Sequence, residues 1–433
     1  MEKHDVNSGF DAIIAGTGPG GATVARELSA RGKKVLMLEW GDNKPLTGGT
    51  LDTLTRMGMP GKGLYITPRL VLVTRAITTG GSSMYYYSTA FDPPHAMLRA
   101  YGIDIRREVE EIRRELPVNP LPDEWIGPMS KRIMESARDL GYGWGKLDKF
   151  IYTDRLSEQS EHRWGFIAAP NWRSKWTARS YVEEAVSRGA VLVNRAKVLR
   201  VLFEGDAAVG VECLRAGRRE RVYGGSIIIS AGGIGTPVIL RASGMPEAGF
   251  NYFFDPLVMA LGTVRDLRVA PEIPMSTGMH CAEDGYVMTD LHVAPFIYFA
   301  CIAEKLRFHR LLSQERTLQI MIKIKDELGG SLGKSGWVHK TLSRNDERKL
   351  QHGYERARRI LTRAGAKGIF RSMVFAAHPG GTVKIGGMLD SNLRTRYANL
   401  YVCDCSVIPE AWGLPPTFTL IALGKRLAKH LIG

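Results

Sequence analysis

The stretch FDAIIAGTGPGGATVARELSARGKKVLMLEWG, at residues 10–41, constrains the fold of this chain more than any other. It reads as an apolar strand, a glycine turn, a helix and a second apolar strand that ends in an acid. Gly16, Gly18 and Gly21 give the spacing G-x-G-x-x-G, and Glu39 follows Gly16 by 23 residues. Elements in this order predict a Rossmann-like α/β unit.

Each part of this unit suits a dinucleotide. The first glycine permits the tight turn, the second lets a pyrophosphate approach the backbone, and the third lets helix and strand pack closely. The helix N-terminus offers free N–H groups and a partial positive charge to phosphates. Glu39 is placed to accept hydrogen bonds from a ribose 2′-hydroxyl, and its charge disfavours the 2′-phosphate of NADP. The unit alone does not separate NAD from FAD, and a glycine-rich turn without a ligand is the alternative.

Three later segments narrow this choice. Residues 75–90, RAITTGGSSMYYYSTA, hold a second glycine-serine loop. Residues 194–217 predict a strand, a turn and a strand, and residues 224–244 predict a buried strand that ends in glycines before a helix. Residues 399–431 predict a strand, a proline-rich turn and a C-terminal helix. An NAD site alone would leave the second loop and the C-terminal segment without a role.

With these segments the chain resembles the glucose-methanol-choline (GMC) oxidoreductases, which are FAD enzymes. The resemblance covers more than half of the chain, in family order, at both ends and in the middle. It is carried by GTGPGG with Glu39, GGSS, ARSYVEEAVSRG, SAGGIGTPVILRASG, HPGGT, NLYVCDCSVIP and PPTFTLIALGKRLA.

The resemblance implies where FAD would be held. The ADP part would lie on the first glycine loop and its acid, at Gly16, Gly18, Pro19, Gly20, Gly21 and Glu39. The remaining implied contacts are Gly80, Gly81 and Ser82 against the flavin, Val198 by the adenine, Ala231 and Gly232 on the phosphate side, Asp404 and Cys405 by the flavin ring, and Pro416 and Thr417. The glycine-serine loop has no histidine for a covalent flavin link, so non-covalent FAD is expected.

The segment FAAHPGGTVKIGG, at residues 375–387, places His378 at the family's active-site histidine. In the family this histidine handles the hydroxyl proton while hydride leaves the carbinol carbon. The chemistry is sound in itself: flavin accepts a hydride, so the protein must manage the proton, and a histidine with a reference pKa near 6.5 suits that task. A structural turn histidine and a metal ligand are the alternatives. No second histidine lies at metal-ligand spacing, so no metal site is expected.

Two positions depart from the family pattern. Pro415 stands where the family has a second active-site asparagine or histidine, and proline offers neither a polar side chain nor a backbone N–H. Tyr86 stands where the family usually has asparagine. A side chain of the central region or one of Tyr85–Tyr87 could supply the missing group. Otherwise the substrate reacts without a second polar side chain, or the reaction is not ordinary alcohol oxidation.

The resemblance and the local patterns together predict two interleaved domains. Residues 1–95, 160–245 and 376–433 would form the Rossmann-like FAD-binding domain. Residues 96–159 and 246–375 would form a smaller α+β substrate-binding or cap domain with an antiparallel sheet. Within the latter we expect an amphipathic helix around Val109, Ile112 and Leu116, strand-like runs at LHVAPFIYFA and TLQIMIKIKDEL, and a helix at DERKLQHGYERARRILTRAG.

The net charge of +15 is spread along the chain, with local groups at Arg215–Arg221, Lys305–Arg310 and Lys425–Lys429. None alternates with aromatics as in nucleic-acid modules, so no nucleic-acid partner is expected. The groups could be solvated faces, or could attract an acidic membrane surface or a partner protein in a complex. Five cysteines without a CxxC pair, and no leader or spanning segment, favour a cytoplasmic location.

The predicted function is FAD-dependent oxidation of a small-molecule alcohol by hydride transfer to flavin, with His378 handling the proton. Aromatic residues of 246–375 could line an apolar substrate pocket or pack in the core. A dehydrogenase that reduces a quinone or a redox protein is preferred over an oxidase, on the basic surface. Pro415 motivates a non-oxidative lyase of the same fold as an alternative. A flavoprotein electron-transfer subunit of a larger complex is the other.

Overall fold

The computed structural model describes residues 9–47, 50–157, 174–268 and 272–433. The predicted domain boundary between residues 159 and 160 lies outside the described residues. So do the first eight residues of the predicted FAD-binding domain. Within the described part of the chain, no helix combines the length and the apolar character needed to cross a bilayer.

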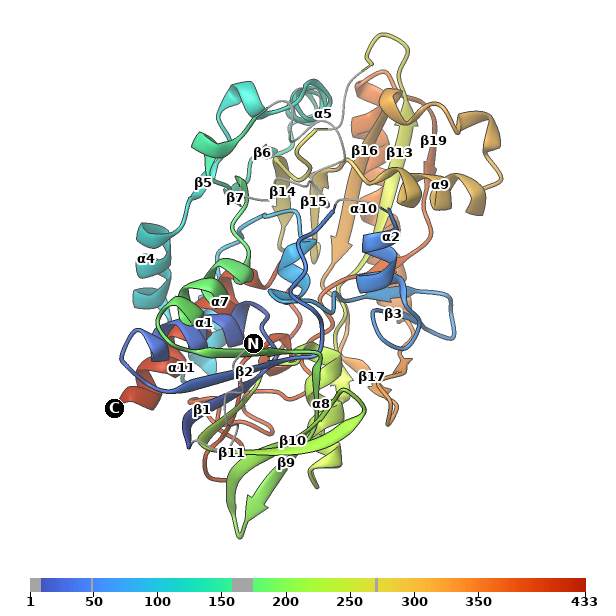
Figure 1. Ribbon diagram of the computed structural model, residues 1–433. Coiled ribbons are helices and arrows are strands. Elements are labelled where there is room, and N and C mark those ends of the chain that lie inside the picture. The colour runs from blue at the N-terminus through green and yellow to red at the C-terminus, as the bar shows by residue number, and fades with distance from the viewer. Residues whose placement is uncertain (1–8, 48–49, 158–173, 269–271) are drawn as a thin grey trace.

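A seven-stranded sheet lies in the lower half of the molecule as Figure 1 is drawn. Its strand β1 (Phe10–Ala15) pairs in parallel with β2 (Val35–Glu39) on one side and β11 (Arg218–Ile229) on the other. β8 (Val191–Asn194) continues beside β2, and β21 (Leu400–Val402) pairs with β11, again in parallel. This parallel sheet confirms the Rossmann-like prediction.

The other elements predicted for this part of the chain are also present. β9 (Ala196–Glu204) and β10 (Ala207–Arg215) form the predicted strand-turn-strand and extend the sheet in antiparallel pairing from the first half of β11. α1 (Pro19–Ser29) packs between α7 (Ala178–Ser187) and α11 (Thr417–Ile432), and Figure 1 shows the three helices stacked together. α8, which spans Gly232–Ala242, follows β11 and packs against β9.

A nine-stranded sheet lies in the upper half of Figure 1. Its central strands are antiparallel in the order β13 (Pro256–Thr263), β16 (Thr317–Ile324), β15 (Tyr286–Asp290) and β14 (Thr277–Cys281). The predicted antiparallel sheet is therefore present, and β16 is the strand predicted at TLQIMIKIKDEL. Alternation along a strand sends successive side chains to opposite faces.

The two faces of this sheet carry different cores. Ile320 and Ile322 of β16 pack under α10 (Arg344–Arg363), which is the helix predicted from residue 346 onward. Met321, between them, belongs to the core on the opposite face, together with α9 (Pro295–Glu304). The same opposite face therefore also carries the side chain of residue 323, two positions further along β16.

One secondary-structure prediction is wrong. The run LHVAPFIYFA was expected to be strand-like, but Pro295 is the first residue of helix α9. Proline favours the first helical position because its fixed φ suits the helix and its missing N–H would be unpaired there anyway. Tyr298, Cys301 and Ile302 then follow at helical spacing and are buried against the sheet.

The amphipathic helix predicted around Val109 and Ile112 is α4 (Arg106–Glu115), with both side chains buried. It packs against α11, in the same core as β1 and β2, although the sequence analysis placed its segment in the cap domain. The domain boundaries themselves stay a prediction.

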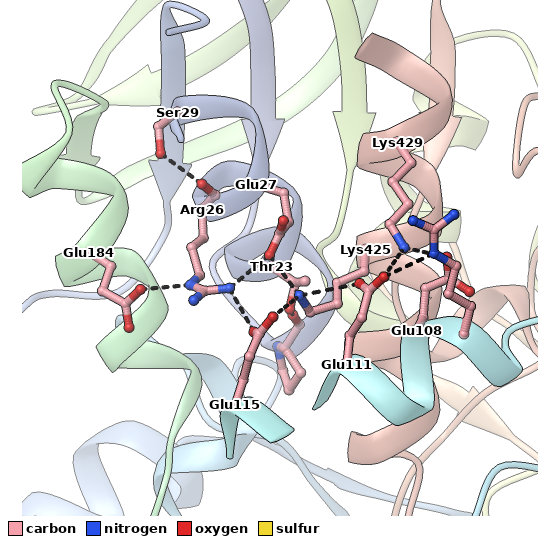
Figure 2. A network of polar contacts seen from close by, with 12 residues as sticks. Thr23, Arg26, Glu27, Ser29, Glu108, Glu111, Glu115, Glu184, Lys425 and Lys429 are labelled. Atoms are coloured by element: carbon pink, nitrogen blue, oxygen red, sulfur yellow. Dashed lines mark hydrogen bonds and ion pairs between the residues drawn. The ribbon is translucent and has the colours of Figure 1, made fainter. Parts of the chain in front are cut away.

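A network of ion pairs joins α4, α1, α7 and α11 (Figure 2). The Lys425 Nζ lies 2.7 Å from a carboxylate oxygen of Glu115, and Lys429 pairs with two further acids of α4. Arg26 of α1 bridges Glu115, at 3.1 Å, and Glu184 of α7, at 2.6 Å. Two of the three basic side chains in the group Lys425–Lys429 are thus paired with acids of the protein itself, Lys425 buried and Lys429 partly exposed.

Shorter elements complete the fold. Two small sheets have the orders β12-β17-β18 and β5-β7. The other described elements that have four or more residues or that pair in a sheet are α2 (Thr50–Thr53), the π-helix η1 (Leu54–Gly58), β3 (Leu64–Ile66), β4 (Leu72–Thr74), the 3₁₀ helix η2 (Gly81–Met84), α3 (His95–Ala100), β5 (Val118–Pro120), α5 (Pro128–Asp139), β6 (Gly145–Lys146), β7 (Asp148–Phe150), β12 (Phe250–Tyr252), β17 (Gly329–Leu332), β18 (Val338–His339), β19 (Lys367–Arg371) and β20 (Phe375–Ala376).

Candidate active site

The first glycine loop leaves an open position in front of α1. Gly16 has a φ of 103°, which favours glycine, and a Cβ there would overlap the Ser230 carbonyl. A Cβ on Gly20 would overlap the carbonyl oxygen of Cys403. A Cβ on Gly18 would instead meet nothing within 4 Å. Gly18 therefore faces free space at the start of the helix, where Pro19 is the first helical residue and an anion would be stabilised.

Glu39 ends β2 and is held by the loop itself. One carboxylate oxygen accepts hydrogen bonds from the backbone N and hydroxyl of Thr17, at 3.2 and 2.7 Å, and the other accepts from the Gly41 N at 2.7 Å. Burial raises the pKa of Glu39, although these hydrogen bonds oppose the rise. A carboxylate has about four acceptor positions, so Glu39 keeps capacity for a ribose hydroxyl.

The glycine-serine loop, for which the resemblance implies flavin contacts, lies against the first glycine loop. Gly80 has a φ of 89° and donates its N–H to the Thr17 hydroxyl at 3.2 Å. A Cβ on Gly81 would lie 3.0 Å from the Cα of Gly18. Ser82 accepts a hydrogen bond from the Ala76 N at 3.1 Å through its hydroxyl oxygen, which fixes the loop.

The start of α8 and the end of β21 close the same region. Gly232 donates its N–H to Asp404 at 2.9 Å, and the other oxygen of Asp404 accepts from the Ser406 N at 2.7 Å. Burial raises the pKa of Asp404, against the effect of these hydrogen bonds. Ala231, just before α8, lies close to the first loop, because a Cβ on Gly16 would be 3.2 Å from its Cα.

Three helices, α1, α8 and α11, begin at residues for which the resemblance implies cofactor contacts. Gly18, Ala231 and Pro416 precede α1, α8 and α11, and none of the three caps its helix with its own side chain, although Asp404 accepts the N–H of Gly232 at the start of α8. Thr417 is the first residue of α11. Helix starts without a side-chain cap, at α1 and α11, and the open position at Gly18 are what a pyrophosphate needs. The residues present therefore fit a dinucleotide.

Val198 lies on β9, which contacts β2, the strand that ends at Glu39. Its neighbour Lys197 lines a cavity of about 640 Å³ that begins at Trp40 and Gly41, directly after Glu39. The Lys197 Nζ lies 4.4 Å from the centre of the Trp40 ring. This cavity adjoins the end of β2 at which an adenosine would extend beyond Glu39.

His378 has a left-handed backbone, with a φ of 54°. Such a conformation is uncommon outside glycine, although histidine adopts it more readily than most residues, and it costs on the order of 1–3 kcal/mol, which the surrounding structure must offset. Its ring Nδ1 lies 3.2 Å from an Asp255 oxygen and 3.2 Å from the Lys323 Nζ, while 29% of the side chain stays exposed. Burial lowers the pKa of His378, the charge of Lys323 lowers it further, and Asp255 opposes both.

The turn that carries His378 packs on the predicted flavin-side residues. A Cβ on Gly380 would lie 2.7 Å from the Cys405 sulfur, and one on Gly233 would overlap the Pro379 carbonyl. The Cys405 thiol donates to the His378 carbonyl at 3.6 Å. His378 thereby lies beside the segment of Asp404 and Cys405, the two residues for which the resemblance implies a place by the flavin ring.

Sequence reasoning missed the partners of His378. Lys323 is buried in the otherwise apolar strand β16, and Asp255 directly precedes β13. A lysine inside an apolar strand run is a signal that could have been read, because buried lysines are rare without a partner.

The sequence predicts Tyr85–Tyr87 as candidates for the polar group that Pro415 lacks, and the structure gives two of these tyrosines other contacts. The Tyr86 hydroxyl donates to the backbone carbonyl of Trp176 at 2.6 Å, and Tyr85 packs in a small core with Leu46 and Met84. The loop of Pro415 lies against β16, since a Cβ on Gly413 would be 3.1 Å from the Ile324 carbonyl carbon. Across the described ranges, no group of three or more His, Cys, Asp or Glu side chains could hold a metal ion.

Comparison with known proteins gives consistent results. A GMC oxidoreductase model matches residues 10–258, and a second one matches residues 337–424. An uncharacterized protein of Methanocaldococcus jannaschii is 26% identical over 424 residues, with 98% of this chain and 100% of that protein covered. A long-chain-alcohol oxidase of Arabidopsis thaliana is 23% identical over 522 residues, with 99% and 69% covered.

Among solved structures, pyridoxine 4-oxidase from Mesorbium loti has a TM-score of 0.74 at 17% sequence identity. The match covers 97% of this chain and 99% of that chain, so the two share a fold. The first family model alone spans more than half of the sequence, in the segments that build the glycine loops and β11. This chain therefore belongs to the GMC oxidoreductase family.

Proposed function

We propose that this chain is an FAD-dependent oxidoreductase that oxidises a CH–OH group, with His378 as the base that takes the hydroxyl proton. The family generally binds FAD, and the glycine loops fit that cofactor together with the starts of α1 and α11, which have no side-chain cap. The relatives named long-chain-alcohol oxidase and the structural neighbour named pyridoxine 4-oxidase support an alcohol donor. The proposed FAD contacts are those given in the sequence analysis.

The observation that carries this proposal is the setting of His378. Its backbone is held in a left-handed conformation on a glycine turn, and the turn packs against Cys405 at the predicted flavin side. One ring nitrogen is occupied by buried partners, while part of the ring stays exposed. A structural turn histidine has no need of two buried charged partners at one nitrogen.

In the proposed reaction, the alcohol C–H bond and O–H bond both break and a C=O bond forms. The bound flavin supplies the chemistry of a hydride acceptor. His378 accepts the remaining proton at its ring, and the lowered pKa keeps that ring neutral and able to do so near neutral pH. The two electrons thus leave with the hydride, and the proton stays on the protein.

For the substrate we propose only a chemical class, and the electron acceptor stays a prediction. The dehydrogenase preference rested on the basic surface, part of which is neutralised by acids of α4. The relatives with informative names are oxidases. A quinone or redox-protein acceptor and a cytoplasmic location therefore remain predictions from the sequence, and a small-molecule alcohol is the substrate class.

The deciding experiment is the visible spectrum of the purified protein, followed by anaerobic mixing with a panel of primary and secondary alcohols of increasing chain length. We expect an oxidised flavin spectrum, FAD released on denaturation, and bleaching by at least one alcohol. Hydrogen peroxide formed on admitting air would identify an oxidase, and bleaching relieved only by a quinone would identify a dehydrogenase. Product formed while the flavin stays oxidised would identify the lyase alternative. A colourless protein that does not bind added FAD would overturn the proposal.

A further inference from the structure

We propose that Asp255 and Lys323 are positioning residues that hold the His378 ring with its proton on Nδ1, so that Nε2 is free to accept the substrate proton. This inference deepens the proposed function and rests on it for the reaction. The side-chain contacts from which it is argued are made between residues of this chain and involve no cofactor or substrate.

The three side chains form a nearly equilateral triangle. The Lys323 Nζ lies 3.1 Å from Oδ2 of Asp255, that same oxygen lies 3.2 Å from the His378 Nδ1, and Nδ1 lies 3.2 Å from the Lys323 Nζ. Lys323 and Asp255 each expose only 1% of their side chains. All polar contacts of the ring that the described residues make are therefore at Nδ1, and Nε2 is left on the exposed side.

The backbone holds this triangle rigidly. The segment before β13 and the His378 turn exchange two hydrogen bonds between Phe253 and Gly380, at 3.1 and 3.0 Å. Asp255, like His378, has a left-handed backbone, with a φ of 48°. Its N–H donates at 3.1 Å to Asp326. Two strained residues that face each other across a paired turn are kept there by the surrounding structure.

Two proton arrangements are compatible with these distances. In the first, Nδ1–H and the Lys323 ammonium both donate to the Asp255 carboxylate, and Nε2 carries a lone pair. In the second, the ammonium donates to both Asp255 and Nδ1, and the proton lies on Nε2. Only the first gives a base at Nε2, and protonation of Nε2 then yields an imidazolium whose Nδ1–H already donates to Asp255. The proposed reaction requires a base, so the first arrangement is the one we assign.

Lys323 has a separate part in this arrangement. Its charge balances the buried Asp255, which would otherwise favour a permanently protonated ring. Lys323 also disfavours the resting imidazolium, so Nε2 is unprotonated when substrate arrives. The central region thus supplies Asp255 and Lys323 to the active site. They contact His378 at Nδ1 and do not take the position of Pro415.

Other titratable groups surround the triangle. Cys405, from the turn after β21, contacts the His378 carbonyl. Asp326 pairs with Lys340 at 2.8 Å and forms the next layer behind Asp255. On the sheet, β14 places His280 opposite Val287, which itself pairs with Lys323, and burial and then the Lys323 charge lower the pKa of His280.

The test is ¹⁵N NMR of histidine-labelled protein, purified with its bound cofactor and measured without substrate. The His378 signals are assigned by their loss in His378→Gln. We expect a neutral ring protonated on Nδ1 in the wild type. Asp255→Asn should move the proton to Nε2 and slow flavin reduction by at least about 10²-fold, because the wrong tautomer faces the substrate. Lys323→Met should keep the Nδ1 proton and raise the pKa of His378, with the pH profile of flavin reduction moving upward in parallel.

Lys340→Met is the matched control, since it removes a buried lysine that does not touch the ring and should leave the tautomer unchanged. If Asp255→Asn does not fold, the charge-neutral double variant Asp255→Asn/Lys323→Met takes its place and should lose the Nδ1 preference. A wild-type ring protonated on Nε2 overturns the inference, as does an unchanged tautomer in whichever Asp255 variant folds. The tautomer is read without turnover, so failure of the alcohol reaction alone would contradict the proposed function and not this arrangement.

Discussion

The backbone of Gly20 in α1 packs directly on the carbonyl of Cys403, which follows β21 at the other end of the chain, and leaves no room for a side chain between them. The contact joins the first helix of the cofactor-binding fold to its last parallel strand. Gly18, two residues earlier, makes no such contact. The two glycines of one motif therefore serve different purposes, packing in one case and ligand approach in the other.

This difference predicts opposite effects of one substitution. Gly20→Ala should lower the free energy of unfolding by about 3 kcal/mol, because a backbone carbonyl cannot move aside as a side chain could. Gly18→Ala should unfold like the wild type but bind FAD at least about tenfold more weakly, a loss of about 1.4 kcal/mol. Urea unfolding of the apoprotein and FAD titration separate the two quantities. Equal FAD affinity in Gly18→Ala and wild type would count against a pyrophosphate at this loop.

His378→Asn tests the proposed base directly. Loss of a general base costs about 10²–10⁴-fold in rate, so anaerobic flavin reduction should slow by that factor while the flavin spectrum stays that of the wild type. Rapid mixing with the best alcohol of the panel gives the rate. The control is His309→Asn, the same substitution at an exposed histidine. Its flavin should be reduced at the wild-type rate. Reduction at the wild-type rate in His378→Asn would remove this residue from the chemistry.

The ion pairs of Figure 2 predict a stability difference between two lysines on one helix. Lys425 exposes 2% of its side chain and pairs with carboxylates of Glu27 and Glu115, whereas Lys429 is 39% exposed. Removing one partner of a buried pair costs about 3–5 kcal/mol. The acids here keep part of their hydration, so we expect about 2 kcal/mol for Lys425→Met and about 0–1 kcal/mol for Lys429→Met.

Salt provides an internal check on that comparison. The deficit of Lys425→Met comes from carboxylates left without a counter-charge, and their repulsion is screened as ionic strength rises. Unfolding by urea in low salt and in 1 M NaCl, where the Debye length is about 3 Å, should therefore narrow the gap to wild type. A gap that is identical in both would assign the loss to packing of the lysine stem.

The elements read correctly from the sequence are those with a local signal. The G-x-G-x-x-G turn, the paired strands at 194–217 and the capped helix α10 each depend on residues close together in the chain. α9 was misread because an apolar, aromatic run suits a strand or a buried helix equally, and Pro295 at its start was the deciding residue. The pairing order of the nine-stranded sheet could not be read, since it joins segments from Leu64 to Ala376.

The residues of the candidate site also separate into those with a local sequence signal and those that only the tertiary structure brings together. His378 could be chosen as a candidate from the sequence because its histidine, proline and glycines are adjacent in the chain. Asp255 directly precedes β13 and Lys323 lies in β16, and only the pairing of these strands in the sheet brings the two side chains to one nitrogen of the ring. The basic group at Lys425 was misjudged for a related reason: its counter-charges lie on α4, about three hundred residues earlier, and amphipathic patterning does not say which helix an acidic face will meet.

His292 gives a prediction for acid stability. It follows β15, exposes only 7% of its surface, and its Nδ1 has no hydrogen-bond partner among the described residues. Burial lowers its pKa from 6.5 to about 4. The unfolded chain therefore binds a proton below about pH 6.5 that the folded protein resists, and stability present above pH 6.5 is lost as the pH falls towards 4. At about 1.36 kcal/mol per pKa unit, the full loss is about 3 kcal/mol.

Urea unfolding at pH 7.5, 6.5, 5.5 and 4.5 measures this effect in the wild type, His292→Gln and the exposed-site control His309→Gln. Other carboxylates and histidines titrate in the same range, so the informative quantity is the difference in free energy of unfolding between each variant and the wild type. For His292→Gln this difference should move in favour of the variant as the pH falls below 6.5, because glutamine takes up no proton in either state. For His309→Gln it should stay constant. If the free energies of unfolding of His292→Gln and the wild type change in parallel with pH, His292 is protonated in the folded protein as readily as in the unfolded chain. The prediction that its buried imidazole stays neutral would then be wrong.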